Sequence, residues 1–474
     1  MWWWIVSLHL LAAYFSVGHA HPDEHFQILE IAWSRVGLAL DHSAVPWEFQ
    51  SQIRGGLAPW IAAIAMRVWP ESPELIALFL RVLASLLGVL ALFSLWRGWR
   101  LQGREAGWIF SFTWFLPYLH ARFSSESIAG SLFWIAIGWI GPEPRSHRWQ
   151  TWLTVGVLLG LATQFRYQCG FLVLGFLFWV GFHFQSRLRV LLATVFGIAL
   201  ATALGAWADH WLYGEWRPVA WNFFRVNLLE GKAAEFGVSP WWEYFRLLAT
   251  QLMAPPWGIL WLVVAALGFF QSKARPLLFS ITPFFLIHCL ISHKEFRFLY
   301  PLAGVLPLLL VLGSERFSLK SRMPWIRRWA LGSWAKGANL LLLALFCLKP
   351  ARYFTAVHLE IQRLSRQGPL CVYTADGLPA FFEHGIPMNF YRPSSVRTFQ
   401  LPEGQEAEAC RKLLYFRGYS DPGAIQRRYP GAKCIYRAFP EWLVQFNPFR
   451  WLERAQGAEL WEILNTGGIS KREE

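Results

Sequence analysis

The feature that most constrains this chain is a succession of apolar runs separated by short polar loops. A helix of about 20 apolar residues crosses the hydrocarbon core of a bilayer. The composition agrees, because 55% of the residues are hydrophobic, 16% are charged and 30 are Trp, whose indole suits the membrane–water interface. The sequence therefore predicts an all-α polytopic membrane protein with about eleven transmembrane helices, at residues 2–18, 73–96, 105–120, 126–141, 151–163, 169–184, 188–208, 248–270, 276–291, 298–313 and 333–349. The first run lacks the basic segment that opens a signal peptide, so we expect it to stay uncleaved.

The positive charge of the chain indicates its topology. Lys and Arg number 44 against 30 Asp and Glu, a formal net charge of +14. A nucleic-acid-binding protein gathers such charge on one soluble face, whereas here basic residues are spread over alternate short loops such as 97–104 and 273–275. Loops of this kind are cytoplasmic in membrane proteins. We expect the bilayer as a partner, no nucleic acid, and a cytoplasmic N-terminus.

The remaining polar stretches then fall on the opposite, exoplasmic side. They include a first loop at 19–72, a large loop at 209–247, the segment 292–297 and the tail. The tail has strand-like runs at 369–375 and 433–439 between turn residues. We expect a transmembrane domain over residues 1–350 and a small soluble exoplasmic α/β domain over residues 351–474.

Cysteine spacing adds one open question. Cys371, Cys410 and Cys434 lie in the tail, where an oxidising compartment would allow one disulfide, and the sequence leaves its partners open. No Cys or His spacing typical of a metal site occurs.

The most unusual polar stretch, HPDEH at residues 21–25, follows the first apolar run directly. Two adjacent acids at the end of a membrane helix do nothing for insertion, so they indicate chemistry; an amphipathic surface helix without chemistry is the alternative. Asp23, Gln27 and Glu30 recur at i, i+4 and i+7, which puts them on one face of an α-helix. His21 and His25 do not form the HExxH arrangement of zinc proteases. We expect no metal and no cofactor.

Two motifs lie in order and on one predicted side of the membrane. They are HPDEHFQILE at 21–30, followed by PWEFQSQIR at 46–54, and SHKEFRFLYP at 292–301. Together they resemble glycosyltransferase family 22, the GT-C-type mannosyltransferases of GPI-anchor and N-glycan assembly, and the HPDE form is closest to the GPI mannosyltransferase branch. Further similarity runs through ARFSSES at 121–127, DHWLYGEW at 209–216 and GVSPWWEYF at 237–245. The chain departs from the family pattern at Ser125, where Asn is common, and at Gly55, where Ser is usual.

The resemblance implies a GT-C-type catalytic domain that moves a hexose, usually mannose, from a polyprenyl- or dolichyl-phosphate sugar to a glycan or glycolipid acceptor, by an inverting mechanism on the exoplasmic face. An acceptor hydroxyl needs a carboxylate base, and we expect Asp23, with Glu24 next, in that role. Cations stabilise the charge that develops on a leaving phosphate. The expected ones are His293, Lys294, Arg297, Arg166 and Arg122. The residues expected to shape the acceptor site are His21, His25, Gln27, Glu30, Trp47, Glu48, Arg54 and Glu295.

Two other functions are compatible with this architecture. A transporter or flippase of lipid-linked glycans would show inverted repeats and charges along the membrane midplane, and the sequence shows no such repeat. A transferase of a larger lipid-linked oligosaccharide would keep the acids and cations and use a wider exoplasmic platform. Short cytoplasmic loops and the absence of an Asn-X-Ser/Thr glycosylation site favour a bacterial inner membrane with a periplasmic site. In a eukaryote the endoplasmic reticulum membrane, with the same side luminal, is expected.

Overall fold

The structure is a computed structural model that describes residues 1–39, 46–143, 148–183, 187–252, 256–320, 324–374, 379–400, 410–418, 422–438, 445 and 457–463. The chain forms two compact units. The helical unit comprises Met1–Phe15, Trp47–Ala62 and Leu78–Lys349, and the tail unit comprises Ser16–Pro46, Ala63–Ala77 and Pro350–Glu474. Two segments of the expected first domain, 16–46 and 63–77, therefore belong to the same compact unit as the tail.

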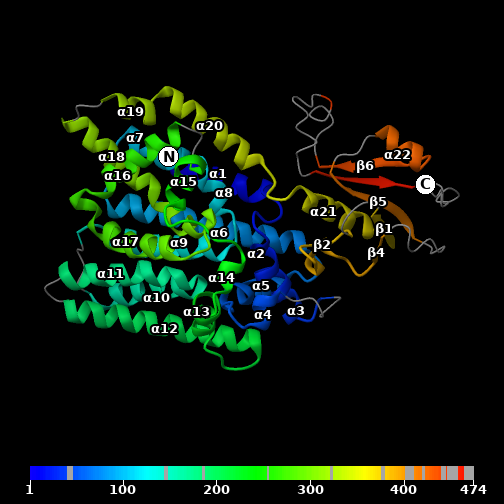
Figure 1. Ribbon diagram of the computed structural model, residues 1–474, viewed down its shortest axis with the longest axis horizontal. Coiled ribbons are helices and arrows are strands. Elements are labelled where there is room, and N and C mark those ends of the chain that lie inside the picture. Colours follow the sequence, from blue (N-terminus) through cyan, green and yellow to red (C-terminus); the bar gives the residue numbers. More distant parts are fainter. Residues whose placement is uncertain are drawn as a thin grey trace. The chain divides into compact units, whose positions relative to one another are not determined.

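Helices occupy all of the apolar runs, as Figure 1 shows. Those of the membrane region are α1 Trp2–Phe15, α4 Trp47–Gln50, α5 Leu57–Val68, α6 Pro73–Gly98, α7 Arg104–Phe112, α8 Leu116–His120, α9 Ser125–Ile140, α10 Trp149–Phe165, η2 Tyr167–Cys169, α11 Gly170–His183 and α12 Arg187–Tyr213. They continue with α13 Val219–Phe224, η3 Arg225–Leu229, α14 Lys232–Glu235, α15 Glu243–Gln251, α16 Trp257–Phe269, η4 Ser272–Ala274, α17 Arg275–Leu290, η5 Phe296–Val305, α18 Leu306–Lys320, α19 Pro324–Leu331 and α20 Ser333–Leu348.

Two of the predicted spans are divided between two helices, and a third changes helix type within one continuous span. The run 105–120 splits into α7 and α8, where Pro117 stands in the first turn of the new helix, a position that tolerates its missing N–H. The run 248–270 splits into α15 and α16, and the run 298–313 begins as the 3₁₀ helix η5, which contains Pro301. Hydropathy alone did not distinguish these breaks from continuous helices.

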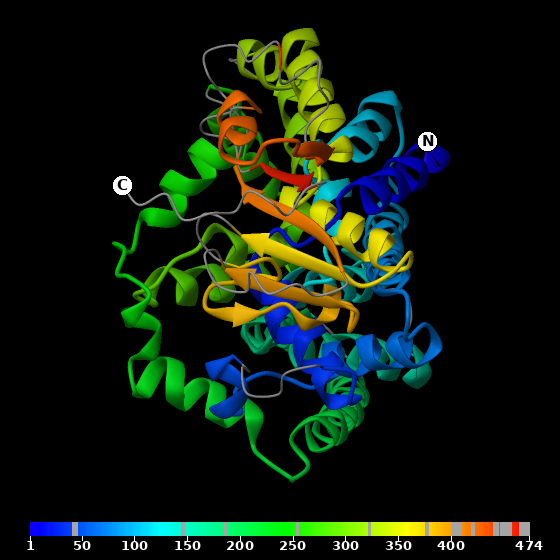
Figure 2. The same ribbon diagram turned by 90° about the vertical axis from the view of Figure 1, so that its right-hand side faces the viewer.

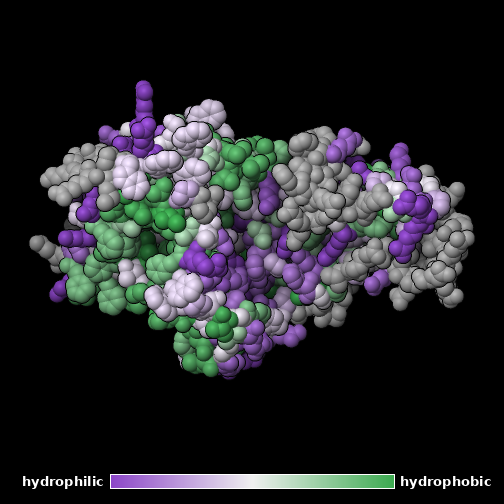
Figure 3. Space-filling view, turned by 45° about the horizontal axis from the view of Figure 1, so that its top comes forward, coloured by the Kyte–Doolittle hydropathy of each residue, from purple (hydrophilic) through white to green (hydrophobic). Residues whose placement is uncertain are grey.

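By length and composition, four helices of the described residues can cross a membrane: Pro73–Gly98, Arg187–Tyr213, Phe296–Arg316 and Trp325–Ser365. The pair Trp257–Phe269 and Ser272–Leu290, bent by 91°, makes a fifth if it is counted as one span. Large apolar side chains are exposed along these helices, and they cover much of the face of the helical unit seen in Figure 3. The polytopic helical membrane class is confirmed, while the number eleven stays a prediction.

Small residues allow the helices of the helical unit to pack closely. A Cβ at Gly156 of α10 would overlap the backbone oxygen of Thr194 in α12, and one at Gly197 would overlap that of Leu153. Close backbone approach at small residues is how membrane helices gain packing contacts without a hydrophobic driving force.

The tail unit contains the predicted α/β region. Its five-stranded sheet has the order β4-β1-β5-β7-β6, in which β4, β1 and β5 are parallel and β7 pairs antiparallel with β5 and β6 (Figure 2). The strands are β1 Leu370–Thr374, β4 Val396–Gln400, β5 Arg411–Arg417, β6 Lys433–Arg437 and β7 Ala458–Glu462. β1 and β6 confirm the strand runs predicted at 369–375 and 433–439 over residues 370–374 and 433–437, while residues 375 and 439 lie outside the described part of the chain.

Shorter elements complete this unit. They are α2 Pro22–Glu24, the π-helix η1 His25–Glu30, α3 Ile31–Arg35, α21 Tyr353–Ser365, the hairpin β2 Phe382–Glu383 and β3 Ile386–Pro387, η6 Asn389–Tyr391 and α22 Pro422–Arg428. One core of the unit packs the side chains of β1, β5 and β7 against Ile425 of α22.

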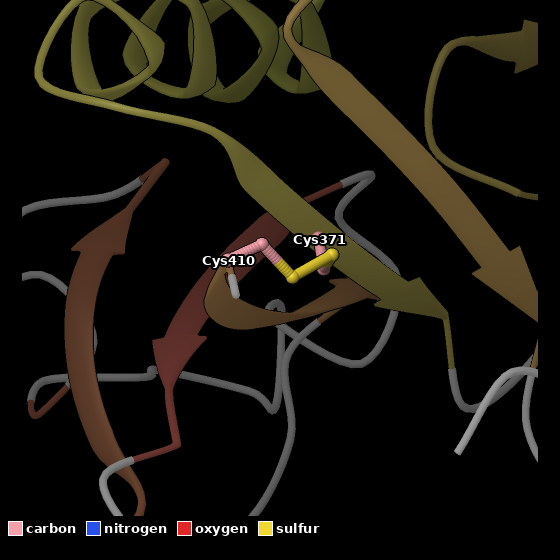
Figure 4. Close-up of a disulfide and its surroundings, with 2 residues drawn as sticks. All are labelled: Cys371 and Cys410. Atoms are coloured by element: carbon pink, nitrogen blue, oxygen red, sulfur yellow. A yellow bond between two sulfur atoms is a disulfide. The ribbon is translucent and has the colours of Figure 1, made fainter. Parts of the chain in front are cut away.

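A disulfide joins Cys371 on β1 to Cys410, immediately before β5, with the two Cα atoms 5.8 Å apart (Figure 4). Cys434 has a free thiol. Of the three tail cysteines, the structure thus pairs Cys371 on β1 with Cys410 next to the neighbouring parallel strand β5. Disulfides persist in oxidising compartments, which agrees with the expected exoplasmic tail.

Candidate active site

The acidic motif forms a single helical turn in the tail unit. His21 caps α2, accepting the N–H of Asp23 on Nδ1 at 3.2 Å, and Pro22 opens the helix. The same His21 nitrogen lies 3.3 Å from Asp23 Oδ1, and Glu24 accepts the N–H of Ala20 at 3.2 Å. The Asp23 side chain is 24% exposed. Both acids therefore lie on a turn that is held locally and is partly exposed.

The helix after this turn does not have the predicted period. Residues 25–30 form a π-helix, η1, in which residues five apart share a face. His25 Nε2 accordingly lies 2.8 Å from Glu30 Oε1, with both side chains buried. The α-helical face predicted for Asp23, Gln27 and Glu30 is wrong over this segment, because the wider turn pairs Glu30 with His25. Gln27 is also buried.

Two arginine side chains, Arg166 and Arg297, meet the carboxylate of Glu126 in the helical unit. Glu126 Oε1, at the start of α9, lies 3.2 Å from Arg166 Nη1 and 3.7 Å from Arg297 Nη1. Both guanidinium groups also lie 5.3 Å from the centre of the Phe298 ring. Glu295 pairs with Arg297. Low exposure of these side chains strengthens their electrostatic interaction.

The other residues of the late motif bind a neighbouring loop. His293 Nε2 lies 2.9 Å from Glu295 Oε1, and its Nδ1 lies 3.2 Å from the carbonyl oxygen of Gly237. Lys294 Nζ donates to the carbonyls of Ser239 at 3.1 Å and Ile291 at 2.6 Å. The structure thus brings residues 292–297 together with the end of the loop 209–247.

The second half of the first loop joins the same region. The Trp47 ring stacks on Phe236 at 6.0 Å, and Phe236 lies 6.0 Å from the His293 ring. Arg54 Nη2 lies 3.5 Å from Glu48 Oε1. Trp47 is therefore linked through one aromatic ring to the predicted phosphate-binding segment.

Residues around Arg54 are fixed to the end of α12. Tyr213 Oη donates to the Arg54 carbonyl at 2.8 Å, and the Gly56 N–H donates to Asp209 Oδ1 at 2.6 Å. A Cβ at Gly56 would overlap the backbone of Ala208. Close backbone approach thus requires glycine at this position.

Arg122 lies on the connection between α8 and α9, 2% exposed, with its guanidinium 5.1 Å from the centre of the Tyr118 ring. It belongs to the helical unit, as do Arg166 and Arg297.

Sequence reasoning missed Glu126 as a site residue. It was visible only as an acid within ARFSSES, three residues after Phe123 and beside Ser125. Its 4% exposure and its two arginine partners come from elements far apart in the chain. In the sequence, the one available signal was an acid four residues after Arg122, at the start of an apolar run.

The acidic turn belongs to the tail unit and the Glu126 cluster to the helical unit. Their meeting in one site stays a prediction, as do the roles assigned to the individual residues. Among the described residues, no group of three or more His, Cys, Asp or Glu side chains is placed to hold a metal ion.

The fold and these side chains define a polytopic membrane protein with buried arginines, one of them in a late motif, and an acidic turn after its first helix. A solved structure of ArnT from Cupriavidus metallidurans bound to undecaprenyl phosphate has a similar fold, with a TM-score of 0.51 at 12% identity over 99% of this chain and 98% of that one.

Residues 1–364 match the model of the Alg9-like mannosyltransferase family, and the chain belongs to this family. It is 27% identical to GPI alpha-1,2-mannosyltransferase 3 of Danio rerio and 26% identical to GPI mannosyltransferase 3 of Yarrowia lipolytica, over 74% and 71% of this chain. The matches span 63% and 64% of those relatives, less than two thirds of their length. Family membership confirms the resemblance drawn from the two motifs.

Proposed function

We propose that this protein transfers mannose from a polyprenyl-phosphate sugar to a glycan or glycolipid hydroxyl at the exoplasmic face of its membrane. The observation that carries the proposal is the Glu126 cluster, in which Arg166 and Arg297 converge beside the late family motif. Arginine is the side chain suited to a phosphate in a partly desolvated place, because its planar fork donates to two oxygens. The two guanidinium groups are the candidate donor-phosphate site.

An apolar cavity in the helical unit, lined in part by Phe296, the residue before Arg297, suits the lipid chain of such a donor. It has a volume of about 400 Å³ and its walls are almost entirely apolar. Phe296 and Tyr300 of η5 line it, and Arg297 stands between them in sequence. A polyprenyl phosphate needs this combination, a cationic site for the headgroup with an apolar space next to it.

In the proposed reaction the acceptor oxygen attacks C1 of the mannosyl donor while Asp23 takes the hydroxyl proton. The bond from C1 to the phosphate oxygen breaks on the opposite face, so the configuration at C1 inverts. The electron pair stays on the leaving polyprenyl phosphate, where Arg166 and Arg297 stabilise the added charge. Glu24 is the alternative base, and His21, through its contact with Asp23, orients the carboxylate.

The acceptor is proposed from the relatives. Several relatives carry the name GPI alpha-1,2-mannosyltransferase 3, so a mannosylated GPI-like glycolipid, which would receive a new mannose through an α-1,2 linkage, is the acceptor class to test first. The disulfide between Cys371 and Cys410 supports an oxidising, exoplasmic side for the tail. That side is periplasmic in a bacterial inner membrane and luminal in the endoplasmic reticulum.

Purified protein in liposomes with labelled polyprenyl-phosphate mannose and a mannosylated acceptor tests the proposal. Labelled product is expected with the wild type, and Asp23→Asn is expected to lower kcat by about 10²–10⁴, the usual contribution of a general base. Glu24→Gln is the matched control for a neighbouring acid, with a smaller loss. Movement of the labelled lipid across the bilayer without product would indicate a flippase. Product from a lipid-linked oligosaccharide alone would indicate a transferase of larger glycans.

A further inference from the structure

The loop that carries Asp23 is bracketed by two buried histidines of the tail unit. His19 is 3% exposed and His25 is 1% exposed, and their rings stack with centroids 5.3 Å apart. The residues between them are partly or fully exposed. The candidate base thus lies on a short loop whose two ends are fixed in the protein interior.

Each of these histidines binds a carboxylate. His19 Nε2 lies 3.0 Å from Glu383 Oε2, and His25 Nε2 lies 2.8 Å from Glu30 Oε1. An ionised carboxylate only accepts hydrogen bonds, so each of these two contacts requires a proton on the histidine Nε2. Arg352 Nε also lies 3.4 Å from His19 Nε2. Burial lowers the pKa of His19 to about 4 even though the Glu383 hydrogen bond opposes it, so the ring is neutral at neutral pH.

The C-terminal segment holds both carboxylates in place. Arg352 Nη2 lies 3.2 Å from Glu383 Oε1, and the N–H groups of Asn389 and Phe390 donate to Glu30 at 3.1 and 2.9 Å. Burial alone would raise the pKa of Glu383, but the His19 hydrogen bond and the charge of Arg352 bring it down to about 2. Glu383 is therefore ionised, and its two oxygens lie 3.0 and 3.2 Å from nitrogens of His19 and Arg352.

A strained backbone fixes the position of Glu383 itself. His384 and Gly385 join β2 to β3 with φ of 51° and 80°, as a type I′ hairpin turn requires. Phe381, immediately before β2, has φ of 58°, which is rare for a bulky residue. Its N–H donates to His358 Nε2 at 3.3 Å, and the two rings stack at 4.4 Å. Such a conformation persists only where its surroundings over-determine it.

We propose that Glu383 is a positioning residue for the transfer reaction, acting through His19 to fix the loop that carries Asp23. The tail then fixes the position of the catalytic base, in addition to any role that it has in binding the acceptor. This inference rests on the proposed function, since it concerns the same base. A misplaced catalytic group loses rate steeply, by about 100-fold for a shift of about 1 Å.

The test uses the full-length protein in liposomes and the transfer assay described above. Glu383→Gln keeps the shape of the side chain and removes its charge. It is expected to lower kcat by at least about tenfold while the KM for the donor changes less than about twofold, because the donor-binding groups are untouched. Glu360→Gln is the matched control in the same unit, since Glu360 pairs with Arg363, which is 68% exposed, and it is expected to leave both constants unchanged.

A double-mutant cycle separates positioning from general loss of stability. If Glu383 acts through His19, His19→Ala alone lowers kcat as much as Glu383→Gln, and the double variant is no worse than either. His19→Gln, which keeps an N–H donor, is expected to restore part of the rate. Hydrogen exchange of the peptide 19–30, measured without substrate, is expected to rise in Glu383→Gln and not in Glu360→Gln.

Wild-type kcat in Glu383→Gln, or additive losses in the cycle, would overturn the positioning role and leave the proposed transferase function standing. A wild type that forms no product would instead overturn the proposed function, and the hydrogen-exchange comparison would then still decide whether Glu383 anchors the loop.

Discussion

Replacing Glu126 by Gln removes the negative charge between two buried guanidinium groups. Glu126 Oε1 lies 3.2 Å from Arg166 Nη1 and 3.7 Å from Arg297 Nη1, and the three side chains are 5%, 7% and 13% exposed. Removing one partner of a buried ion pair costs about 3–5 kcal/mol, since the other charge stays buried. At about 2 °C per kcal/mol for a protein of this size, the midpoint of thermal unfolding in detergent is expected to fall by about 6–10 °C.

The kinetic effect of Glu126→Gln has a distinct signature. Without Glu126 the two arginines are less neutralised, so the donor phosphate is expected to bind as tightly as before or more tightly. Their geometry is no longer held, and kcat is expected to fall about 10–100-fold, which corresponds to about 1.4–2.7 kcal/mol of transition-state stabilisation. A falling kcat with an unchanged or lower donor KM is therefore the predicted pattern.

Both effects are measured with one preparation, by thermal unfolding in detergent and by initial rates of mannose transfer per folded protein. Glu235→Gln is the matched control, because Glu235 pairs with Lys232 at the surface, with side chains 63% and 35% exposed, and such pairs contribute about 0–1 kcal/mol. A Glu126→Gln protein with the stability and kcat of the wild type would refute the role assigned to this cluster. A raised donor KM with unchanged kcat would refute the idea that Glu126 fixes the geometry of the two arginines without itself contributing to donor binding.

Three further predictions concern the fold. Gly56→Ala is expected to destabilise the protein by about 2–5 kcal/mol, because the new Cβ overlaps Ala208 and disturbs the hydrogen bond from the Gly56 N–H to Asp209. Thermal unfolding measures the loss, and Gly181→Ala, where the new Cβ meets open space, is the neutral control. Cys371→Ser opens a disulfide that spans 39 residues and is expected to cost about 4 kcal/mol; mass spectrometry that found Cys434 in the disulfide would contradict the pairing. The pKa values of His19 and Glu383 are lowered to about 4 and about 2 in the folded chain. The unfolded chain therefore binds more protons, and the tail unit is expected to lose stability as the pH falls. The loss that comes from His19 lies between about pH 6.5 and 4, and the loss that comes from Glu383 lies between about pH 4.5 and 2. Unfolding followed by far-UV circular dichroism tests this, and an unfolding midpoint that stays constant over this pH range would contradict it.

Local patterns in the sequence were enough for the class of protein and for its family. Runs of apolar residues report on transfer into lipid, a property of each segment by itself, so every predicted span contains helix. The strands at 370–374 and 433–437 were readable for the same reason, since alternation and turn residues are local. The motifs at 21–30 and 292–301 identified the family that the comparison of residues 1–364 confirms.

Only the tertiary structure decided which charges face one another. Glu126 with Arg166 and Arg297, and Glu383 with His19, are pairs formed by segments distant in sequence, and nothing in local composition encodes such contacts. The π-helical turn at 25–30 also depends on tertiary partners, because Glu30 is held by the N–H groups of residues 389 and 390 and by His25. The acids of the HPDEH motif were visible in the sequence. The groups that hold its two ends in place became visible only when the chain was folded, since burial and long-range hydrogen bonds set their arrangement.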